Sequence, residues 1–144
     1  LKLARLRPSN AELLFDADDG NRGKNGCKVQ LWGKGPKGPS GTKDLRIVPL
    51  EDGYCKIVLK STGLVVQAAT DAPNARGFPA ELWEWNGSRH QQWMFVKVGK
   101  HFRILNRATG RVLEADPDRL RENGCQVKLG TYRREAHQLW TILD

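Results

Sequence analysis

The stretch HQQWMFV, residues 90–96, recurs 47 residues later as HQLWTIL, residues 137–143. Gln91 and Gln138 hold the same place in the two copies, and a tryptophan follows each glutamine by two residues. Counting back another 47 residues from Gln91 leads to Asp44, in KDLRIV, which we interpret as a degenerate third copy. Self-similarity at a fixed period indicates a fold built from repeated structural units, so the sequence predicts three of them.

Three units of 47 residues account for nearly all of the 144 residues, a length that fits a single domain. We place the repeats at residues 1–47, 48–94 and 95–144. The first unit is four residues longer in its last loop, GKGPKGPSG, where glycine and proline exclude regular structure. Glycines at equivalent places support this frame, each five residues before a leucine: Gly26, Gly77 and Gly124 precede Leu31, Leu82 and Leu129.

The apolar pattern of each unit predicts about four short β-strands. In the third unit they are FRILN, RVLEA, QVKLG and LWTIL, separated by turn dipeptides such as Thr109-Gly110 and Asn123-Gly124. No stretch sustains a helical period, so we expect an all-β chain with pseudo-threefold symmetry. One unit alone would expose its apolar face, and three must therefore close on one another. A threefold β architecture of this length indicates a β-trefoil.

Three such units, with LWEWNG upstream of the second motif, resemble the R-type lectins, the ricin B-chain type of β-trefoil. The resemblance covers essentially the whole chain. It implies that the two Gln-x-Trp motifs are mainly structural, with Gln138 part of the framework and with Trp93 and Trp140 filling the centre of the fold. A large ring repeated by symmetry suits a shared core.

Aromatic residues upstream of the second motif suggest two different roles. We expect strand alternation to send Leu82 and Trp85 to one face and Trp83 to the other. Trp85 and its equivalent Tyr132 are then predicted to be core residues, whereas Trp83 and its equivalent Trp32 face solvent. An exposed indole is a candidate platform for the apolar face of a sugar ring. The alternative is that Trp32 and Trp83 are partly buried under a neighbouring loop.

The resemblance also implies which residues would bind sugar: an Asp after the second strand, a polar residue two before the aromatic, the aromatic itself, and an Asn-Gln-type pair at the motif. The first repeat offers Asp16, Gln30 and Trp32, with Lys43 and Asp44 at the pair. The second offers Gln67, Glu81, Trp83, His90 and Gln91. The third offers Glu114, Lys128, Gly130, His137 and Gln138.

No repeat carries the complete set, and we rank the first ahead of the second. The first keeps the acid, the amide and the ring. The second has Gln67 in place of the acid, so it is predicted to lose the charged acceptor that grips a pair of hydroxyls. The third has Gly130 where the ring would stand and is predicted to be structural.

The three cysteines, Cys27, Cys55 and Cys125, are predicted to be unpaired, because the pseudo-threefold symmetry should hold the first and third apart. Free thiols favour a reducing compartment, although a secreted or toxin-associated domain stays open. Asn86-Gly87-Ser88 is a glycosylation sequon in an exported eukaryotic protein and otherwise a turn. A start at Leu1 rather than Met also fits a piece of a larger multidomain protein.

The net charge of +8 is distributed unevenly. The first repeat has ten basic and five acidic residues, the second four and five, and the third ten and six, which gives +5, −1 and +4. Such a field favours anionic partners such as acidic glycans, and the alternative is solubility alone. No nucleic-acid-binding motif is present, which argues against nucleic acid, and no apolar run reaches membrane-spanning length.

Catalytic, cofactor and metal-binding motifs are absent from the sequence, so we expect a domain that is not an enzyme. His90 and His137 hold equivalent places before the motif glutamines and are not a catalytic pair. The sequence predicts a lectin domain for glycans or glycoproteins of galactose or N-acetylgalactosamine type, or for acidic glycans. The alternative is a protein-interaction or anion-binding scaffold that uses the loop from Gly33 to Gly41.

Overall fold

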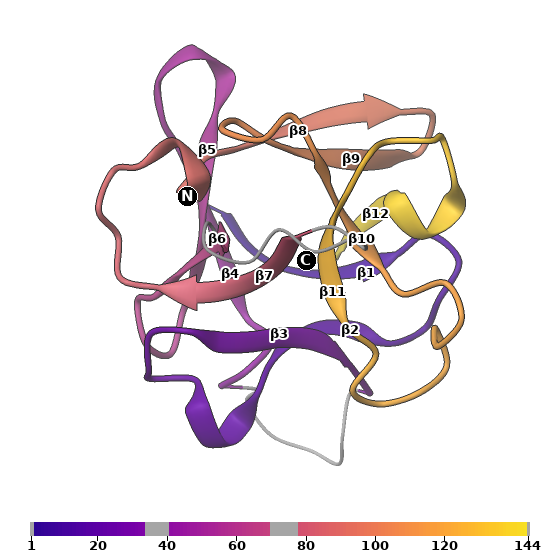
Figure 1. The fold of residues 1–144 in the computed structure, drawn as a ribbon, viewed down its shortest axis with the longest axis horizontal. Coiled ribbons are helices and arrows are strands. Elements are labelled where there is room, and N and C mark those ends of the chain that lie inside the picture. Colours follow the sequence, from indigo (N-terminus) through magenta and orange to yellow (C-terminus); the bar gives the residue numbers. More distant parts are fainter. Residues whose placement is uncertain (1, 34–40, 70–77, 144) are drawn as a thin grey trace.

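The computed structural model describes residues 2–33, 41–69 and 78–143, and all its regular structure apart from four single-turn 3-10 helices is β (Figure 1). The twelve strands within these ranges are β1 (Lys2–Pro8), β2 (Leu14–Ala17), β3 (Cys27–Trp32), β4 (Leu45–Pro49), β5 (Cys55–Leu59), β6 (Val65–Ala68), β7 (Phe78–Trp83), β8 (Trp93–Val98), β9 (His101–Asn106), β10 (Val112–Ala115), β11 (Val127–Gly130) and β12 (Trp140–Leu143). The 3-10 helices are η1 (Asp19–Asn21), η2 (Glu51–Gly53), η3 (Arg89–Gln91) and η4 (Ala136–Gln138). None of these helices could span a membrane.

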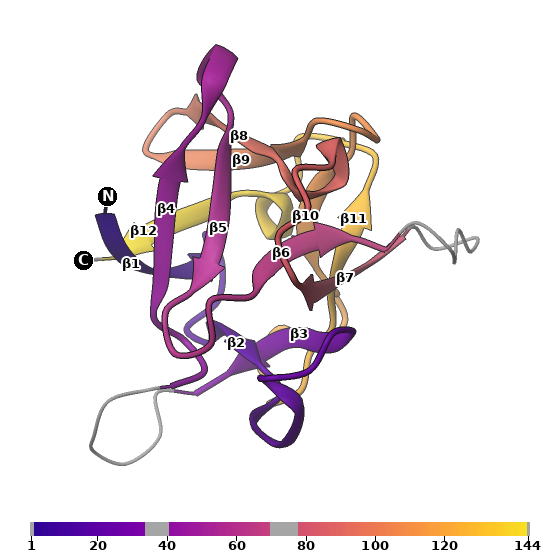
Figure 2. The same ribbon diagram turned by 90° about the vertical axis from the view of Figure 1, so that its left-hand side faces the viewer.

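Half of the strands close into a barrel (Figure 2). Around it, β1 pairs with β4, β4 with β5, β5 with β8, β8 with β9, β9 with β12, and β12 with β1. The other strands form the hairpins β2–β3, β6–β7 and β10–β11. These hairpins join through β3–β7 and β7–β11 pairing and a bridge between Gln30 and Gln126. A closed barrel with a triplet of hairpins is the β-trefoil predicted from the repeats.

Each repeat contributes two barrel strands and one hairpin. The strands group as β1–β4, β5–β8 and β9–β12, so the repeats meet at the turns that follow β4 and β8. The boundaries drawn from the sequence at residues 47 and 94 fall inside these two strands, because the motif begins a strand rather than ending a unit.

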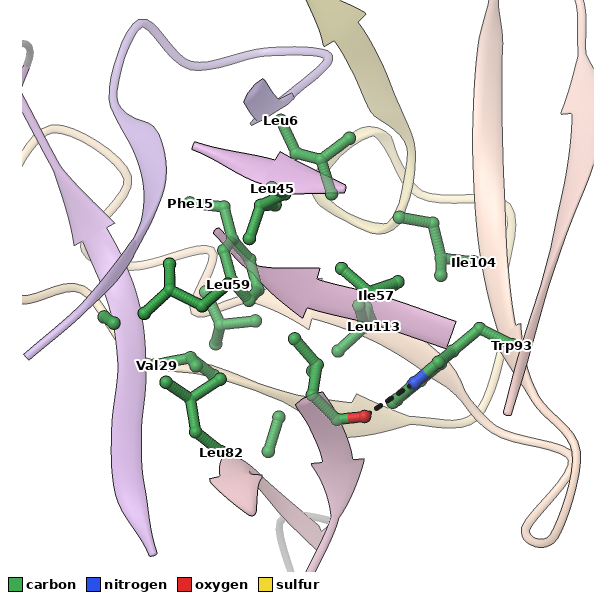
Figure 3. Close-up of a cluster of buried hydrophobic side chains, with 14 of the residues drawn as sticks. Leu6, Phe15, Val29, Leu45, Ile57, Leu59, Leu82, Trp93, Ile104 and Leu113 are labelled. Atoms are coloured by element: carbon green, nitrogen blue, oxygen red, sulfur yellow. Dashed lines mark hydrogen bonds between the residues drawn. The ribbon is translucent and has the colours of Figure 1, made fainter. Parts of the chain in front are cut away.

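The core is one cluster of buried apolar side chains to which all three repeats contribute (Figure 3). Trp93 and Trp140 are fully buried there, as predicted. Each indole N–H donates to a backbone oxygen in the hairpin of its own repeat: Trp93 Nε1 to Val66 O and Trp140 Nε1 to Leu113 O, both at 2.9 Å. A buried indole N–H without a partner would be costly, so these bonds fix both rings.

The first repeat breaks this pattern, and the structure corrects its register by one residue. Trp93 opens β8 opposite Asn106, and Leu45 opens β4 opposite Leu59, the equivalent of Asn106. Leu45 is therefore the residue that replaces the motif tryptophan. The degenerate motif is Lys43-Asp44-Leu45, so the position of the motif glutamine belongs to Lys43 and not to Asp44. The extra length of the first repeat is three residues rather than four.

Phe15 compensates for the smaller side chain at Leu45. Phe15 lies opposite a leucine in its hairpin. The residues in the same position of the other two hairpins, each also opposite a leucine, are Val66 and Leu113. The first repeat thus combines a phenylalanine in its hairpin with a leucine in its barrel strand. The other two repeats combine a smaller aliphatic residue in the hairpin with a tryptophan in the barrel strand. The Phe15 ring packs edge-on against Trp140, with centroids 6.3 Å apart. The larger ring at Phe15 thus offsets part of the volume that leucine lacks at position 45, as close packing favours.

Trp85 is not a core residue, and that prediction is wrong. β7 ends at Trp83, so strand alternation does not extend to Trp85, which is 38% exposed. Its ring lies under the Lys56 ammonium, 4.7 Å from the ring centroid. The equivalent Tyr132 is half-buried and carries Arg103 over its face at the same distance of 4.7 Å. Both rings therefore pack outside the core against a cation of the barrel wall.

The three cysteines are free and buried. Cys27 and Cys125 hold equivalent places, and their thiols donate to the backbone oxygens of Asp18 and Asp116. Burial raises the pKa of both thiols, and it raises the pKa of Cys55 to about 12. A neutral, buried thiol is a poor nucleophile, so these residues are packing groups.

Candidate functional site

A pocket of about 440 Å³ opens at the hairpin of the first repeat. It brings together the acid, the amide and the ring that the sequence singled out, together with the residue at the motif glutamine position. The lining residues are Asp16, Asp18, Asp19, Arg22, Gln30, Trp32, Gly33, Gly41, Thr42 and Lys43. Asp44 is absent from this lining.

The hairpin β2–β3 sets the geometry of the polar floor. Asp16 lies directly opposite Gln30 in the antiparallel register, so their side chains share one face. Gln30 Nε2 donates to Asp16 Oδ2 at 2.9 Å. Trp32 is two residues beyond Gln30 in the same strand, which places its ring on that face too. The sequence predicted this trio, and the structure brings it together.

Lys43 completes the floor from the turn that precedes β4. Its Nζ lies 2.9 Å from Asp16 Oδ1, and the two side chains are only 8% and 5% exposed. Each carboxylate oxygen of Asp16 therefore has one protein donor, and each keeps capacity for another hydrogen bond. Asp44 points elsewhere and pairs with Arg5 Nε at 2.7 Å. Its predicted place in the sugar site is corrected to Lys43, since the register shift moves the motif by one residue.

Trp32 forms the apolar wall of the pocket and is 42% exposed. The third repeat supports it: a Cβ on Gly124 would lie 3.9 Å from Cζ3 of the indole. Beside this contact, Gly33 N donates to Asn123 Oδ1 at 2.9 Å. The positive φ of +92° at Gly124 suits glycine.

The tryptophan of the second repeat is supported by its neighbouring repeat in the same way. Trp83, 37% exposed, lies over Gly26 of the first repeat, and Glu84 N donates to Asn25 Oδ1 at 2.9 Å. Sequence analysis missed this support by the neighbouring repeat. Its signal was present, because Asn25-Gly26 and Asn123-Gly124 recur in the repeat frame ahead of equivalent strands.

The charges that line the first pocket nearly cancel. Among the lining residues that the structure describes, three carboxylates face two cations, which leaves one net negative charge. Lys43 pairs with Asp16, and Arg22 Nη1 lies 3.4 Å from Asp19 Oδ1. Asp18 accepts a hydrogen bond from Asn21 Nδ2 at 2.8 Å. The basic surplus of the first repeat therefore lies mostly outside this pocket.

The second repeat contains the same polar pair with the two strands exchanged. Gln67 in β6 lies opposite Glu81 in β7, and Gln67 Nε2 donates to Glu81 Oε2 at 2.8 Å. The carboxylate thus moves to the strand that carries the ring, two residues before Trp83. The prediction that the second repeat lacks a charged acceptor is corrected by this exchange.

Gln91 and His90 lie behind the polar pair of the second repeat. Gln91 is fully buried, and its Nε2 donates to Gln67 Oε1 at 3.0 Å and to Glu84 O at 2.8 Å. Its Oε1 accepts from Asn86 N at 2.8 Å, so the amide is committed to protein groups. His90 contacts Ser88 through its backbone N–H and Asn106 through its carbonyl. Gln91 therefore holds Gln67 from within the fold, whereas His90 is half-buried and these two bonds involve only its backbone.

The third repeat fills its own pocket. Glu114 lies opposite Lys128 and accepts from Gln138 Nε2 at 2.9 Å. Its carboxylate occupies the space that a side chain on Gly130 would need. His137 is buried, with Nδ1 3.6 Å from Glu135 Oε2. No ring is available there, and Gln138 is structural as predicted.

No group of three or more His, Cys, Asp or Glu side chains that could hold a metal occurs in the described ranges.

Among solved structures, the designed threefold-symmetric protein ThreeFoil superimposes with a TM-score of 0.88 at 20% identity, covering 99% of this chain and 98% of its own. An exo-β-1,3-galactanase from Clostridium thermocellum superimposes with a TM-score of 0.85 at 20% identity, covering 98% of this chain and 30% of its own. A Polyporus squamosus lectin superimposes with a TM-score of 0.78 at 14% identity, covering 97% of this chain and 48% of its own.

These likenesses establish the fold, and the chain spans only about a third of the galactanase and half of the lectin. No curated protein matches the sequence significantly. The model of the ricin-type β-trefoil lectin domain-like family matches residues 45–130, more than half of the chain. The chain therefore belongs to the ricin-type β-trefoil lectin-like family of carbohydrate-binding domains.

Proposed function

We propose that the first repeat binds a neutral, galactose-type sugar in the pocket between Trp32 and Asp16. The observation that carries this proposal is the grouping of an exposed indole with an acid–amide pair in one pocket. The apolar face of a pyranose would stack on Trp32. Its hydroxyls would donate to the remaining acceptor sites of Asp16 and exchange hydrogen bonds with the Gln30 amide.

The balance of charge favours a neutral sugar over an acidic one. A ligand carboxylate or sulfate would meet described lining residues that carry one net negative charge, and the two cations among them already pair with aspartates. Galactose agrees with the names of two structural neighbours, a β-1,3-galactanase and a lectin bound to Neu5Acα2-6Galβ1-4GlcNAc. The pairing of the carboxylates also suits binding rather than acid–base chemistry, so we propose a domain without turnover of its own.

The second repeat offers a second site, built on Trp83, Glu81 and Gln67. Glu81 Oε2 accepts from Gln67, and Glu81 Oε1 could accept from a hydroxyl of a sugar stacked on the ring. Gln91 would act only by positioning this pair. We propose weaker binding here, because Gln67 donates to Glu81 and accepts from Gln91 and so has a single N–H left for a ligand.

Calorimetry and a glycan array with the purified domain test the proposal. Trp32→Ala should abolish binding of galactosides at the first site. Trp85→Ala is the matched control, since it removes an indole of similar exposure that is not among the residues lining the pocket. Binding to neutral galactosides should also change little between low and physiological salt, because no ligand charge is screened.

The alternative function is an interaction scaffold that uses the loop from Gly33 to Gly41, whose residues 34–40 lie outside the described part of the chain. Loss of all binding at higher salt, with Trp32→Ala equal to the unmodified domain, would favour that scaffold over the lectin.

A further inference from the structure

Lys43 stands where the other two repeats carry the motif glutamine, and it differs from them in what it can offer a ligand. Gln91 and Gln138 are buried, and each amide nitrogen donates both to the residue equivalent to Asp16 and to a backbone oxygen. Each amide oxygen accepts from the preceding loop. Neither glutamine has a hydrogen-bonding group left for a sugar.

The ammonium of Lys43 has three N–H groups and, among the described residues, two oxygen partners. These are Asp16 Oδ1 at 2.9 Å and Thr42 Oγ1 at 3.4 Å. Lys43 also lines the pocket beside Trp32 and Gln30. One donor hydrogen of Lys43 therefore remains for a ligand oxygen that enters the pocket. Directly beside it lies the Asp16 carboxylate oxygen, which can accept a hydrogen bond from the same ligand.

We propose that Lys43 donates this hydrogen bond to the bound sugar and, with Asp16, selects a vicinal diol. This inference rests on the proposed function of the first pocket and adds its specificity. A donor and an acceptor 2.9 Å apart match two hydroxyls on adjacent ring carbons. One hydroxyl donates to Asp16 Oδ1 and the other accepts from Lys43 Nζ. A sugar that lacks either hydroxyl leaves the ion pair intact but one of its two ligand-facing positions without a hydrogen bond, which weakens binding.

A purely structural role is the competing explanation. Gln138 holds the Glu114 carboxylate at 2.9 Å, and Lys43 could hold Asp16 in the same way without touching the sugar. Gln138 also shows that glutamine is compatible with a carboxylate at this place, so Lys43→Gln should fold. Lys24→Gln is the matched control, because it removes the same charge from an exposed residue of the same repeat.

The experiment is a calorimetric titration of both variants and the unmodified domain with methyl β-galactoside and its 3-deoxy and 4-deoxy analogues. We expect the unmodified domain to bind each deoxy sugar at least about tenfold more weakly than the parent. Lys43→Gln should bind the parent galactoside about tenfold more weakly than the unmodified domain does. For the analogue that lacks the hydroxyl accepting from Lys43, the two proteins should have the same affinity. Lys24→Gln should behave as the unmodified domain throughout.

Equal losses for all three sugars in Lys43→Gln would overturn the inference in favour of a positioning role, and an unchanged affinity for the parent would overturn it outright. If Lys43→Gln fails to fold, the unmodified domain still decides the point: a deoxy sugar that binds as well as the parent excludes the diol clamp. Failure of the unmodified domain to bind the parent galactoside is a different result, since it removes the proposed function itself.

Discussion

Trp32 of the first repeat lies against Gly124 of the third, where an added Cβ would stand 3.9 Å from Cζ3 of the indole. The exposed indole of one repeat is thus supported by a turn of its neighbour, and the same holds for Trp83 and Gly26. Closure of the three repeats therefore does more than bury their apolar faces. It also fixes the orientation of the rings that a ligand would contact.

The bond between Gly33 N and Asn123 Oδ1 leads to the first prediction. Asn123→Ala should lower galactoside affinity at the first site about fivefold, because a lost hydrogen bond of about 1 kcal/mol loosens the chain beside Trp32. Asn25→Ala removes the equivalent bond to Glu84 in the second repeat and should leave the first site unchanged. Calorimetry measures both. Equal effects of the two substitutions would mean that the Asn side chains stabilise the fold alone.

The buried pair of Lys43 and Asp16 leads to a prediction on stability. Lys43→Met should lower the free energy of unfolding by about 3–5 kcal/mol, because it strands a buried carboxylate. Arg5→Met breaks a more exposed pair with Asp44, 30% and 21% exposed, and should cost about 1 kcal/mol. Urea unfolding followed by tryptophan fluorescence compares them. Similar small losses in the two variants would show that water reaches Asp16 freely.

The thiol of Cys55 makes stability depend on pH. Burial raises its pKa from 9.0 to about 12, so the unfolded chain loses this proton first as the pH rises. The stability that the buried, protonated Cys55 thiol contributes is complete below pH 9 and is lost between pH 9 and 12. The stability difference between the unmodified domain and Cys55→Ala should therefore fall by about 1 kcal/mol between pH 8 and 10. Other titrating groups cancel in this difference, and a constant difference would contradict the burial of the thiol.

The fold could be predicted from the sequence because its signal is repeated. Two intact Gln-x-Trp motifs 47 residues apart fix the period, and the strand pattern recurs around them. The trio of Asp16, Gln30 and Trp32 was predicted from the resemblance to the R-type lectins, and the register of the β2–β3 hairpin places the three side chains on one face.

The motif of the first repeat was not placed correctly, because nothing local marks it. Lys43 and Leu45 share no side-chain chemistry with Gln and Trp, and only strand pairing reveals that Leu45 opens β4. Trp85 was misplaced because it was assigned to the face of Leu82, whereas a period of two puts it on the face of Trp83, and β7 in any case ends at Trp83. The exchange of acid and amide between Gln67 and Glu81 needed the pairing of two strands to be recognised.

Compensation between Phe15 and Leu45 gives the last prediction. Leu45→Trp alone should lower the free energy of unfolding by about 1–3 kcal/mol, because Phe15 already fills the space that Val66 leaves for Trp93 in the second repeat. Phe15→Val alone should also destabilise, by leaving a cavity. The double variant restores the combination found in the second repeat and should be at least about 1 kcal/mol more stable than the sum of the single effects predicts. Urea unfolding of all four proteins completes the cycle. Additive effects would mean that the two residues do not share a packing site, and that the first repeat closes its core by some other adjustment.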